Sequence, residues 1–242
     1  MTPAKPLVVG HRGAALLAPE NTLSSFRRAL ADGADLLECD VHLSSDGTVM
    51  VIHDETIDRT AGPDSPLRTG AIADLSSREL ETVRQAHDEH IPTLAQLLEL
   101  TTVPLFIEVK VPAAARAVGE MLADLPQGSP EAASTVISFH AEALAEIRRT
   151  SPETPVSYLV EVIDEQAIAT ARELGAVAVG PAIDGLCLAA ARAVLEAGLS
   201  LHPWTVNTEQ QLQVALACGA GSITTDDPGW VKEQLAERQP RR

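Results

Sequence analysis

Residues 36–54 constrain the fold most, because acidic side chains interrupt a stretch that otherwise predicts buried strands. Residues 36–43 read Leu-Leu-Glu-Cys-Asp-Val-His-Leu, which alternates apolar and polar residues. Side chains on a strand alternate between its two faces, so Glu38, Asp40 and His42 share one face. The apolar side chains cover the other face. The sequence therefore predicts a strand with one apolar face and one face of potential ligands.

A hairpin is predicted directly after this strand. Residues 44–47, Ser-Ser-Asp-Gly, are typical of a tight turn, and residues 48–52 predict a second short strand that ends at His53 and Asp54. Folding back in this way would bring His53 close to the acids of the first strand. The sequence thus predicts a site that combines two carboxylates with a histidine.

The buried acids need a counter-charge. An unpaired buried carboxylate is costly, so Glu38 and Asp40 are expected either to form an internal salt bridge or to bind a metal ion. Glu108 and Lys110 repeat the same i, i+2 spacing, facing the same way as Phe106, on a predicted strand over 103–110. Three carboxylates on two neighbouring strands are the oxygen set that Mg²⁺ or Ca²⁺ prefers, and the sequence lacks the Cys and His spacing of a zinc site.

Strand-like and helix-like segments alternate along the whole chain. About eight such alternations in 242 residues predict an α/β protein, a single (β/α)₈ TIM barrel over 1–242. A doubly wound open sheet is the alternative, which the lack of a linker and of a Gly-rich dinucleotide motif disfavours. The predicted strands besides 36–43 and 48–52 are 7–10, 103–110, 135–139, 156–160, 177–180, 199–206 and 222–225. The predicted helices are 21–31, 95–100, 113–123, 142–149, 165–174, 188–197, 209–217 and 230–237.

One segment breaks this rhythm. About forty residues separate His53 from Thr93, and they contain the turn-rich stretch 62–66 and a capping-box pattern at 76–79. We therefore expect a small helical insertion over approximately 55–92. Loops that follow barrel strands lie on the face where barrel enzymes keep their sites, so this insertion is expected to overhang the acids.

The charge balance limits the partners of the protein. The chain has 34 acidic residues against 18 Lys and Arg, a net charge of −16, which argues against binding to nucleic acid or to an anionic membrane surface. Three cysteines in this length predict free thiols and a reducing compartment. After residues 1–6, which carry one Lys, the apolar run 7–9 is too short for the hydrophobic region of a secretory signal. No apolar run reaches membrane-spanning length. We expect a cytoplasmic protein without stable membrane association; the oligomeric state stays open.

Other motifs are less specific. His11-Arg12-Gly13 directly follows the first predicted strand, so these side chains either form part of a site at the barrel rim or belong to a solvated turn. Trp204 at the end of the seventh barrel strand could line a pocket or fill the core. Residues 224–228 predict a helix cap, with Asp227 at the cap and Pro228 just inside the helix. The remaining histidines are expected on the surface or with ordinary partners: His42, His87, His90, His140 and His202. The tail over 239–242 is predicted to be frayed.

Taken in order, the motifs resemble the glycerophosphodiester phosphodiesterase family over nearly the whole chain. Each is weak alone, but their number and order make the resemblance specific. The matching motifs are His-Arg-Gly at 11–13, Pro-Glu-Asn-Thr at 19–22, Glu-x-Asp at 38–40, Asp-Gly at 46–47, His-Asp at 53–54, Arg-Thr at 59–60, Ile-Pro-Thr-Leu at 91–94, Glu-x-Lys at 108–110, Trp-Thr-Val-Asn at 204–207 and Thr-Asp-x-Pro at 225–228.

The resemblance implies a barrel with an insertion after the second strand, a divalent cation, and hydrolysis of glycerophosphodiesters to glycerol 3-phosphate and an alcohol. Phosphodiester cleavage needs a cation, a base and an acid, and the chain offers all three. The metal ligands would be Glu38, Asp40 and Glu108. His11 would act as base and His53 as acid, an order that comes from the resemblance. The substrate-binding residues would be Arg12, Lys110 and Trp204.

Two other functions remain open at this stage. A lysophospholipase D or a phosphodiester lyase on the same barrel would need an apolar surface at the mouth for an acyl chain, and the insertion sequence shows no exposed apolar stretch. A non-catalytic module that binds phosphodiesters would be expected to lack a histidine or an acid of the set, whereas this chain retains all of them.

Overall fold

Strand β2 (Leu36–Leu43) lies between its two parallel neighbours and fixes their register. The computed structural model describes residues 5–238, so the frayed tail expected at 239–242 and the first four residues lie outside it. Strand β1 (Leu7–Gly10) pairs with β2 on one side, and β4 (Leu105–Val109) pairs on the other with Asp40 opposite Glu108. This register is what brings the acids of two strands together.

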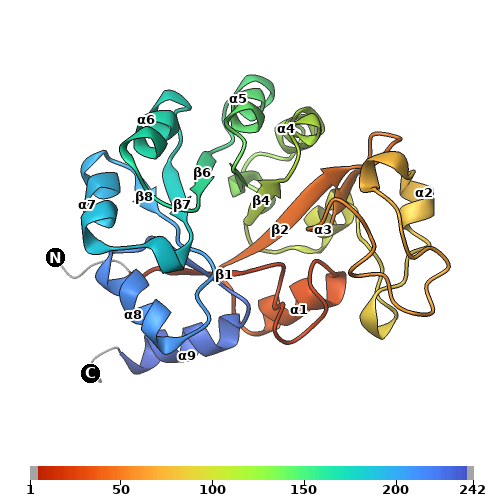
Figure 1. Ribbon diagram of the computed structural model, residues 1–242, viewed down its shortest axis with the longest axis horizontal. Coiled ribbons are helices and arrows are strands. Elements are labelled where there is room, and N and C mark those ends of the chain that lie inside the picture. Colours follow the sequence, from red (N-terminus) through yellow and green to blue (C-terminus); the bar gives the residue numbers. More distant parts are fainter. Residues whose placement is uncertain (1–4, 239–242) are drawn as a thin grey trace.

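The strands form a ring (Figure 1). Their order is β8-β7-β6-β5-β4-β2-β1-β9, and every pairing along this path is parallel. Backbone hydrogen bonds close the ring between the ends of this path: Gly221 N, next to β9, donates to Leu201 O of β8, and Val206 N, after β8, donates to Thr224 O of β9, both at 2.8 Å. The remaining strands are β5 (Thr135–Ser138), β6 (Val156–Val160), β7 (Ala178–Pro181), β8 (Ser200–Leu201) and β9 (Ser222–Thr225). The predicted TIM barrel is confirmed, and the open sheet is wrong.

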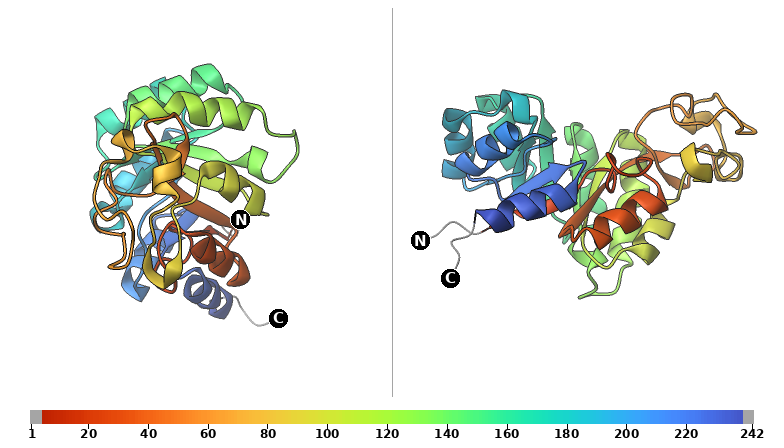
Figure 2. Two further views of the ribbon diagram at one scale, coloured as in Figure 1. Left: turned by 90° about the vertical axis from the view of Figure 1, so that its right-hand side faces the viewer. Right: turned by 90° about the horizontal axis from the view of Figure 1, so that it is seen from below.

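Helices surround the ring on the outside (Figures 1 and 2). Each predicted helix is present, with ends that differ by at most two residues from the prediction. The helices are α1 (Leu23–Ala31), α3 (Leu94–Leu100), α4 (Ala115–Ala123), α5 (Ala141–Thr150), α6 (Glu165–Glu173), α7 (Leu188–Glu196), α8 (Glu209–Ala217) and α9 (Pro228–Glu237). The cap predicted at Asp227 forms, and Thr22 caps α1; both side chains accept hydrogen bonds from the backbone.

The alternation of side chains along β2 divides the core in two. Leu37, Cys39 and Val41 are fully buried in the large apolar layer between strands and helices. Leu36 points to the other side, where it joins a smaller cluster inside the barrel that contains Phe106. Glu38 and Asp40 share this inner face, so the barrel interior combines an apolar floor with charged side chains near the mouth.

The predicted strand over 199–206 is wrong in extent, because β8 ends at Leu201. Pro203, the second residue after β8, has no N–H to donate to a neighbouring strand. The chain nevertheless continues beside β7, with Trp204 N donating to Pro181 O at 3.1 Å. Trp204 therefore keeps the place at the barrel mouth that a longer strand would have given it.

The insertion follows the hairpin of β2 and β3 (Val49–Val51) and lies to one side of the barrel (Figure 1, orange to yellow). It contains the short helix α2 (Ser77–Leu80), which begins at the predicted capping box of Ser76 and Glu79. Its apolar residues form a separate cluster: Met50, Ile52, Ile57, Ile72, Leu80, Val83 and Ile91. The expectation that it overhangs the acids is wrong, since none of residues 54–92 lines the cavity at the mouth. The antiparallel hairpin carries the insertion outward instead.

Among residues 5–238, none of the helices combines the length and the apolar character that crossing a membrane would require.

Candidate active site

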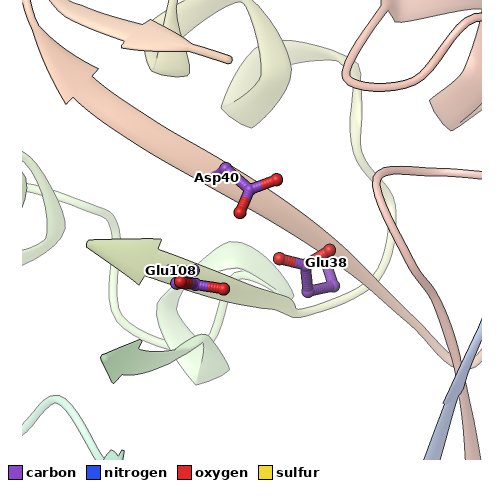
Figure 3. A group of neighbouring side chains, drawn as sticks. All are labelled: Glu38, Asp40 and Glu108. Carbon is purple, nitrogen blue, oxygen red and sulfur yellow. The ribbon is translucent and has the colours of Figure 1, made fainter. Parts of the chain in front are cut away.

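Three carboxylates meet inside the mouth of the barrel (Figure 3). Glu38 and Asp40 come from β2 and Glu108 from β4, and one oxygen of each lies within 4.8 Å of the others. Glu38 is 2% exposed and Asp40 is fully buried, while Glu108 is half-buried. The i, i+2 spacing places the first two on one face, and the parallel register places Glu108 beside Asp40.

Two cations offset part of this negative charge. Arg12 Nε lies 3.2 Å from Asp40 Oδ2, and Lys110 Nζ lies 3.5 Å from Asp40 Oδ1 and 2.7 Å from Glu108 Oε1. The internal salt bridge that the sequence left open is therefore present. Burial alone would raise the pKa of Asp40, but Arg12 and Lys110 outweigh it and lower that pKa.

The negative charge of Glu38 is offset far less by neighbouring positive charges. Its Oε2 accepts a hydrogen bond from Arg12 N at 2.8 Å, yet burial, and after it the charge of Asp40, raises the pKa of Glu38 to about 8. Burial and Asp40 also raise the pKa of Glu108, against the effect of Lys110. The protein side chains by themselves do not stabilise three carboxylate charges at this place.

A hard divalent cation fits this cluster. Within the described residues, Glu38 Oε1 and Asp40 Oδ1 are buried and accept no hydrogen bond, and Asp40 Oδ1 has the Lys110 ammonium only at 3.5 Å. Buried carboxylate oxygens without donors are unfavourable unless a cation contacts them. The donors are all oxygen atoms, which matches Mg²⁺ or Ca²⁺ and not a metal that prefers nitrogen or sulfur.

His11 lies where β1 ends, on the other side of the acids from Lys110. Its Nδ1 is 2.6 Å from Asp226 Oδ1, and its Nε2 is 4.0 Å from Glu38 Oε2. A carboxylate only accepts hydrogen bonds, so Nδ1 carries the hydrogen and Nε2 faces the site. Burial lowers the pKa of His11, but the bond to Asp226 and the charge of Glu38 outweigh it, and the pKa is raised overall.

His53 follows β3 and is held in the same manner. Its Nδ1 lies 2.7 Å from Asp54 Oδ1, and Arg59 Nε donates to Asp54 Oδ2 at 2.6 Å. The hairpin thus delivers a second imidazole oriented by a carboxylate. His42, expected to have an ordinary partner, contacts the backbone oxygen of His53 through Nε2 at 3.0 Å.

These groups line one cavity of about 260 Å³. Trp204 lies on its apolar side, where its ring meets Phe139 edge-on at 5.5 Å between centroids and its Nε1 donates to Gly180 O at 2.9 Å. Seven of the predicted site residues line the cavity: His11, Arg12, Glu38, His53, Glu108, Lys110 and Trp204. The eighth, Asp40, is fully buried and makes its contacts from the same face of β2 as Glu38.

The comparison with known proteins agrees with this geometry. Residues 11–230 match the model of the glycerophosphoryl diester phosphodiesterase family. The chain belongs to this family. A probable glycerophosphodiester phosphodiesterase 1 of Mycobacterium tuberculosis is 32% identical, over 96% of this chain and 93% of that one. A glycerophosphodiester phosphodiesterase of Caldanaerobacter subterraneus subsp. tengcongensis is 28% identical, over 93% and 95% of the two chains.

Solved structures extend the likeness to three dimensions. A phosphodiesterase of Oleispira antarctica, in complex with the product sn-glycerol-3-phosphate, superposes with a TM-score of 0.87 at 25% identity, over 96% of this chain and 97% of that one. A putative glycerophosphoryl diester phosphodiesterase of Silicibacter pomeroyi superposes with a TM-score of 0.86 at 26% identity, over 97% and 94%. This family member is an enzyme, a phosphoric diester hydrolase of the glycerophosphodiester phosphodiesterase class.

Three further residues of this phosphodiesterase contribute to the site, although the sequence alone predicted no role for them there. Asp226 directly follows β9 and contacts His11, whereas the pattern at 224–228 predicted only the helix cap at the neighbouring Asp227. Asn207 donates through Nδ2 to Asp226 Oδ2 and so fixes that carboxylate. His202 lines the cavity and stacks on Phe106 with ring centroids 5.2 Å apart. Asn207 and Asp226 both lie in motifs that carry the family resemblance, at 204–207 and 225–228, which was the signal available for them. His202 lies outside these motifs, and only tertiary contacts place it in the site.

His202 predicts a pH dependence of stability. Burial lowers its pKa from 6.5 to about 4, so the unfolded chain binds a proton below pH 6.5 that the native protein does not bind. The contribution of His202 to the free energy of unfolding is therefore retained above pH 6.5 and is lost as the pH falls toward 4. Between pH 7 and pH 5.5 this group lowers the free energy of unfolding by about 1 kcal/mol.

Urea unfolding at these two pH values measures the effect, and pH 5.5 stays above the isoelectric point of about 4.7. His202→Gln should reduce the pH dependence by that amount relative to the wild type. An unaltered pH dependence in His202→Gln would contradict the assignment.

Proposed function

We propose that this phosphodiesterase hydrolyses glycerophosphodiesters, such as glycerophosphocholine or glycerophosphoethanolamine, to glycerol 3-phosphate and an alcohol. The observation that carries the proposal is the pair of imidazoles, each oriented by a carboxylate on Nδ1, beside three carboxylates and two cations in one cavity. The Oleispira antarctica relative, which binds sn-glycerol-3-phosphate as product, supports the same class of substrate.

Glu38, Asp40 and Glu108 would hold the cation, Mg²⁺ or Ca²⁺. The bound cation would supply positive charge to the phosphate oxygens as negative charge develops on them. Arg12 and Lys110 already lie beside the acids and line the cavity, so their free N–H groups are placed to contact the phosphate. Trp204 would form the apolar wall against the carbon skeleton of the substrate.

His11 would take a proton from the nucleophile and His53 would give one to the leaving alkoxide. With Nδ1 bonded to Asp226, neutral His11 presents a free lone pair on Nε2, which is what a base requires. The contact between Nδ1 of His53 and Asp54 fixes the imidazole at the cavity, and Nε2 would give the proton. The two imidazoles come from β1 and β3, so they approach the cavity from different strands.

A lysophospholipase D activity is the second candidate. Leu16 and Leu17, in the loop between β1 and α1, are 69% and 40% exposed, and Leu16 N donates to Asp226 O at 3.1 Å, directly beside the partner of His11. Two leucines offer a small surface for an acyl chain. Rates on glycerophosphocholine and on lysophosphatidylcholine, compared for the wild type and for Leu16→Ser, separate the two functions.

We further propose a cytoplasmic location, because Cys39 and Cys218 are buried free thiols and Cys187 is an exposed one. The acidic balance supports a small-molecule partner rather than nucleic acid, and no stable association with a membrane. We also propose that residues 1–242 form one domain, with approximately 55–92 as its insertion.

The first prediction concerns the cation. Glu38→Gln and Asp40→Asn keep the shape of the ligands but remove their charge, so metal-supported turnover should fall to background. Added Mg²⁺ or Ca²⁺ should also raise the unfolding temperature of the wild type, since binding at a hundredfold excess over Kd contributes about 2.7 kcal/mol. The two variants should lack this shift, and Glu165→Gln on α6, outside the cavity, should retain it. Activity that survives in excess chelator, with the metal shown to be gone, would contradict the assignment.

The second prediction concerns the two histidines. A positioned acid or base contributes about 10²- to 10⁴-fold, so His11→Ala and His53→Ala should each lower kcat by at least the smaller factor without changing circular dichroism. A nitrophenolate leaving group hardly needs a proton. His53→Ala should therefore lower kcat much less on nitrophenyl esters than on choline esters. An equal loss in kcat on both esters would contradict the acid role of His53.

The third prediction concerns the nucleophile. In a glycerophosphodiester the hydroxyl next to the phosphorylated carbon can attack the phosphorus and give a cyclic phosphate, which water then opens. Intramolecular attack can be worth about 7 to 11 kcal/mol, so the 2-deoxy analogue of glycerophosphocholine should lose orders of magnitude in kcat at saturation. Cyclic glycerol phosphate should be hydrolysed in the second half of the reaction. Comparable kcat values for both diesters would instead mean that water attacks directly.

A further inference from the structure

Arg59 of the insertion binds the carboxylate that orients His53. Its Nε donates to Asp54 Oδ2 at 2.6 Å, and one of its terminal nitrogens donates to Asp54 Oδ1 at 3.0 Å. These two hydrogen bonds form the bidentate arrangement in which arginine holds a carboxylate most firmly. They are also the largest cause that lowers the pKa of Asp54 well below its usual range. Arg59 thus keeps Asp54 ionised and turned toward the imidazole.

The same guanidinium binds a second carboxylate, in the loop between β1 and α1. Two nitrogens of Arg59 donate to Glu20, to Oε2 at 2.9 Å and to Oε1 at 2.7 Å. Glu20 Oε1 also accepts a hydrogen bond from Arg12 at 2.9 Å. Burial alone would raise the pKa of Glu20, but the bonds from Arg59 and the charge of Arg12 outweigh it and lower that pKa. Glu20 therefore links the insertion to the phosphate-binding arginine.

The turn that carries Arg59 is firmly seated. Ile57 is fully buried in the apolar cluster of the insertion, and its backbone oxygen accepts hydrogen bonds from Thr60 N at 3.2 Å and Ala61 N at 2.9 Å. Ile57 N donates to Gly70 O at 3.1 Å, which ties the turn to the next part of the insertion. The insertion lies beside the barrel (Figure 2) and contributes no residue of 54–92 to the cavity lining, so Arg59 is its connection to the site.

We propose that Arg59 is a positioning residue, which fixes His53 through Asp54 and Arg12 through Glu20. The inference rests on the proposed roles of His53 and Arg12. Because the Arg59 side chain is 49% exposed, its ion pairs add little to stability, and its effect should appear in catalysis. Lysine carries the charge but lacks the planar fork, so it cannot hold both carboxylates in the same geometry.

The experiment compares Arg59→Ala and Arg59→Lys on choline and nitrophenyl esters of glycerol phosphate. Misplacing a catalytic group by about 1 Å can cost about 10²-fold, so Arg59→Ala should lose up to that factor in kcat on the choline ester and much less on the nitrophenyl ester. Arg59→Lys should restore part of the loss. Arg84→Ala is the matched control, since Arg84 lies in the insertion and pairs with Asp88 away from the cavity, and its kcat should equal that of the wild type.

A double-mutant cycle tests the coupling to His53. If Arg59 acts through His53, the double variant His53→Ala/Arg59→Ala should be no slower than His53→Ala on the choline ester. The proposal would be overturned if the kcat losses of the two single variants multiplied in the double variant. It would also be overturned if Arg59→Ala lowered kcat equally on both esters while His53→Ala lowered it mainly on the choline ester. If His53→Ala lowers kcat equally on both esters, the proposed acid role of His53 is wrong. The cycle still decides whether Arg59 and His53 are coupled.

The proposed link from Arg59 through Glu20 to Arg12 is tested by measuring substrate-analogue binding. Glu20→Gln removes the charge that pairs with Arg12, and Arg59→Ala removes the guanidinium that fixes Glu20. Both variants should therefore weaken the binding of glycerol 3-phosphate, by about tenfold. Arg84→Ala should bind glycerol 3-phosphate as the wild type does. Unchanged affinity in both Arg59→Ala and Glu20→Gln would overturn the link between the insertion and Arg12.

Discussion

The burial of three carboxylates on one face of two neighbouring strands is the constraint on which the rest of the structure depends. Charges of one sign at this separation repel strongly in a poorly solvated interior. Arg12 and Lys110 offset Asp40 and part of Glu108, but Glu38 is left with a pKa of about 8. The proposed divalent cation would supply the charge that the side chains lack. A site for that cation would account for the charged side chains inside this barrel.

The loop between β1 and α1 is shaped to meet the acids. Arg12 and Asn21 both adopt left-handed backbone conformations, with φ of 49° and 55°, which cost energy for residues other than glycine. Hydrogen bonds offset this cost. Asn21 Nδ2 donates to Asp40 Oδ2 at 2.8 Å, and Ser25 Oγ donates to Arg12 O at 2.8 Å. A Cβ on Gly13 would lie 2.4 Å from Ser25 Oγ, so only glycine permits this close packing of the loop against α1.

The two histidines reach the cavity by different routes but are held by the same chemistry. His11 and its partner Asp226 lie 215 residues apart in the sequence, at the ends of neighbouring strands β1 and β9. His53 and Asp54 are adjacent in the chain, and their geometry depends on Arg59 from the insertion. One pair is therefore fixed by barrel closure and the other by the insertion. The two halves of the proposed acid and base chemistry consequently depend on different parts of the fold.

The sequence by itself determined the barrel, the β2–β3 hairpin and the composition of the acidic cluster. Alternating side chains and eight strand–helix repeats are local patterns, and local geometry fixes which face Glu38 and Asp40 share. The motif order also predicted the family to which the chain belongs. Helix starts such as Thr22 followed from capping chemistry, which involves only a few neighbouring residues.

Only the tertiary structure decided the partners of these groups. The bond between His11 and Asp226, the stacking of His202 on Phe106 and the bridge made by Arg59 join residues that no local pattern connects. The early end of β8 and the outward position of the insertion likewise depend on how the barrel closes and how the hairpin packs. Hydrogen bonds and ion pairs act over a few ångströms in space, and the distance along the chain carries no information about them.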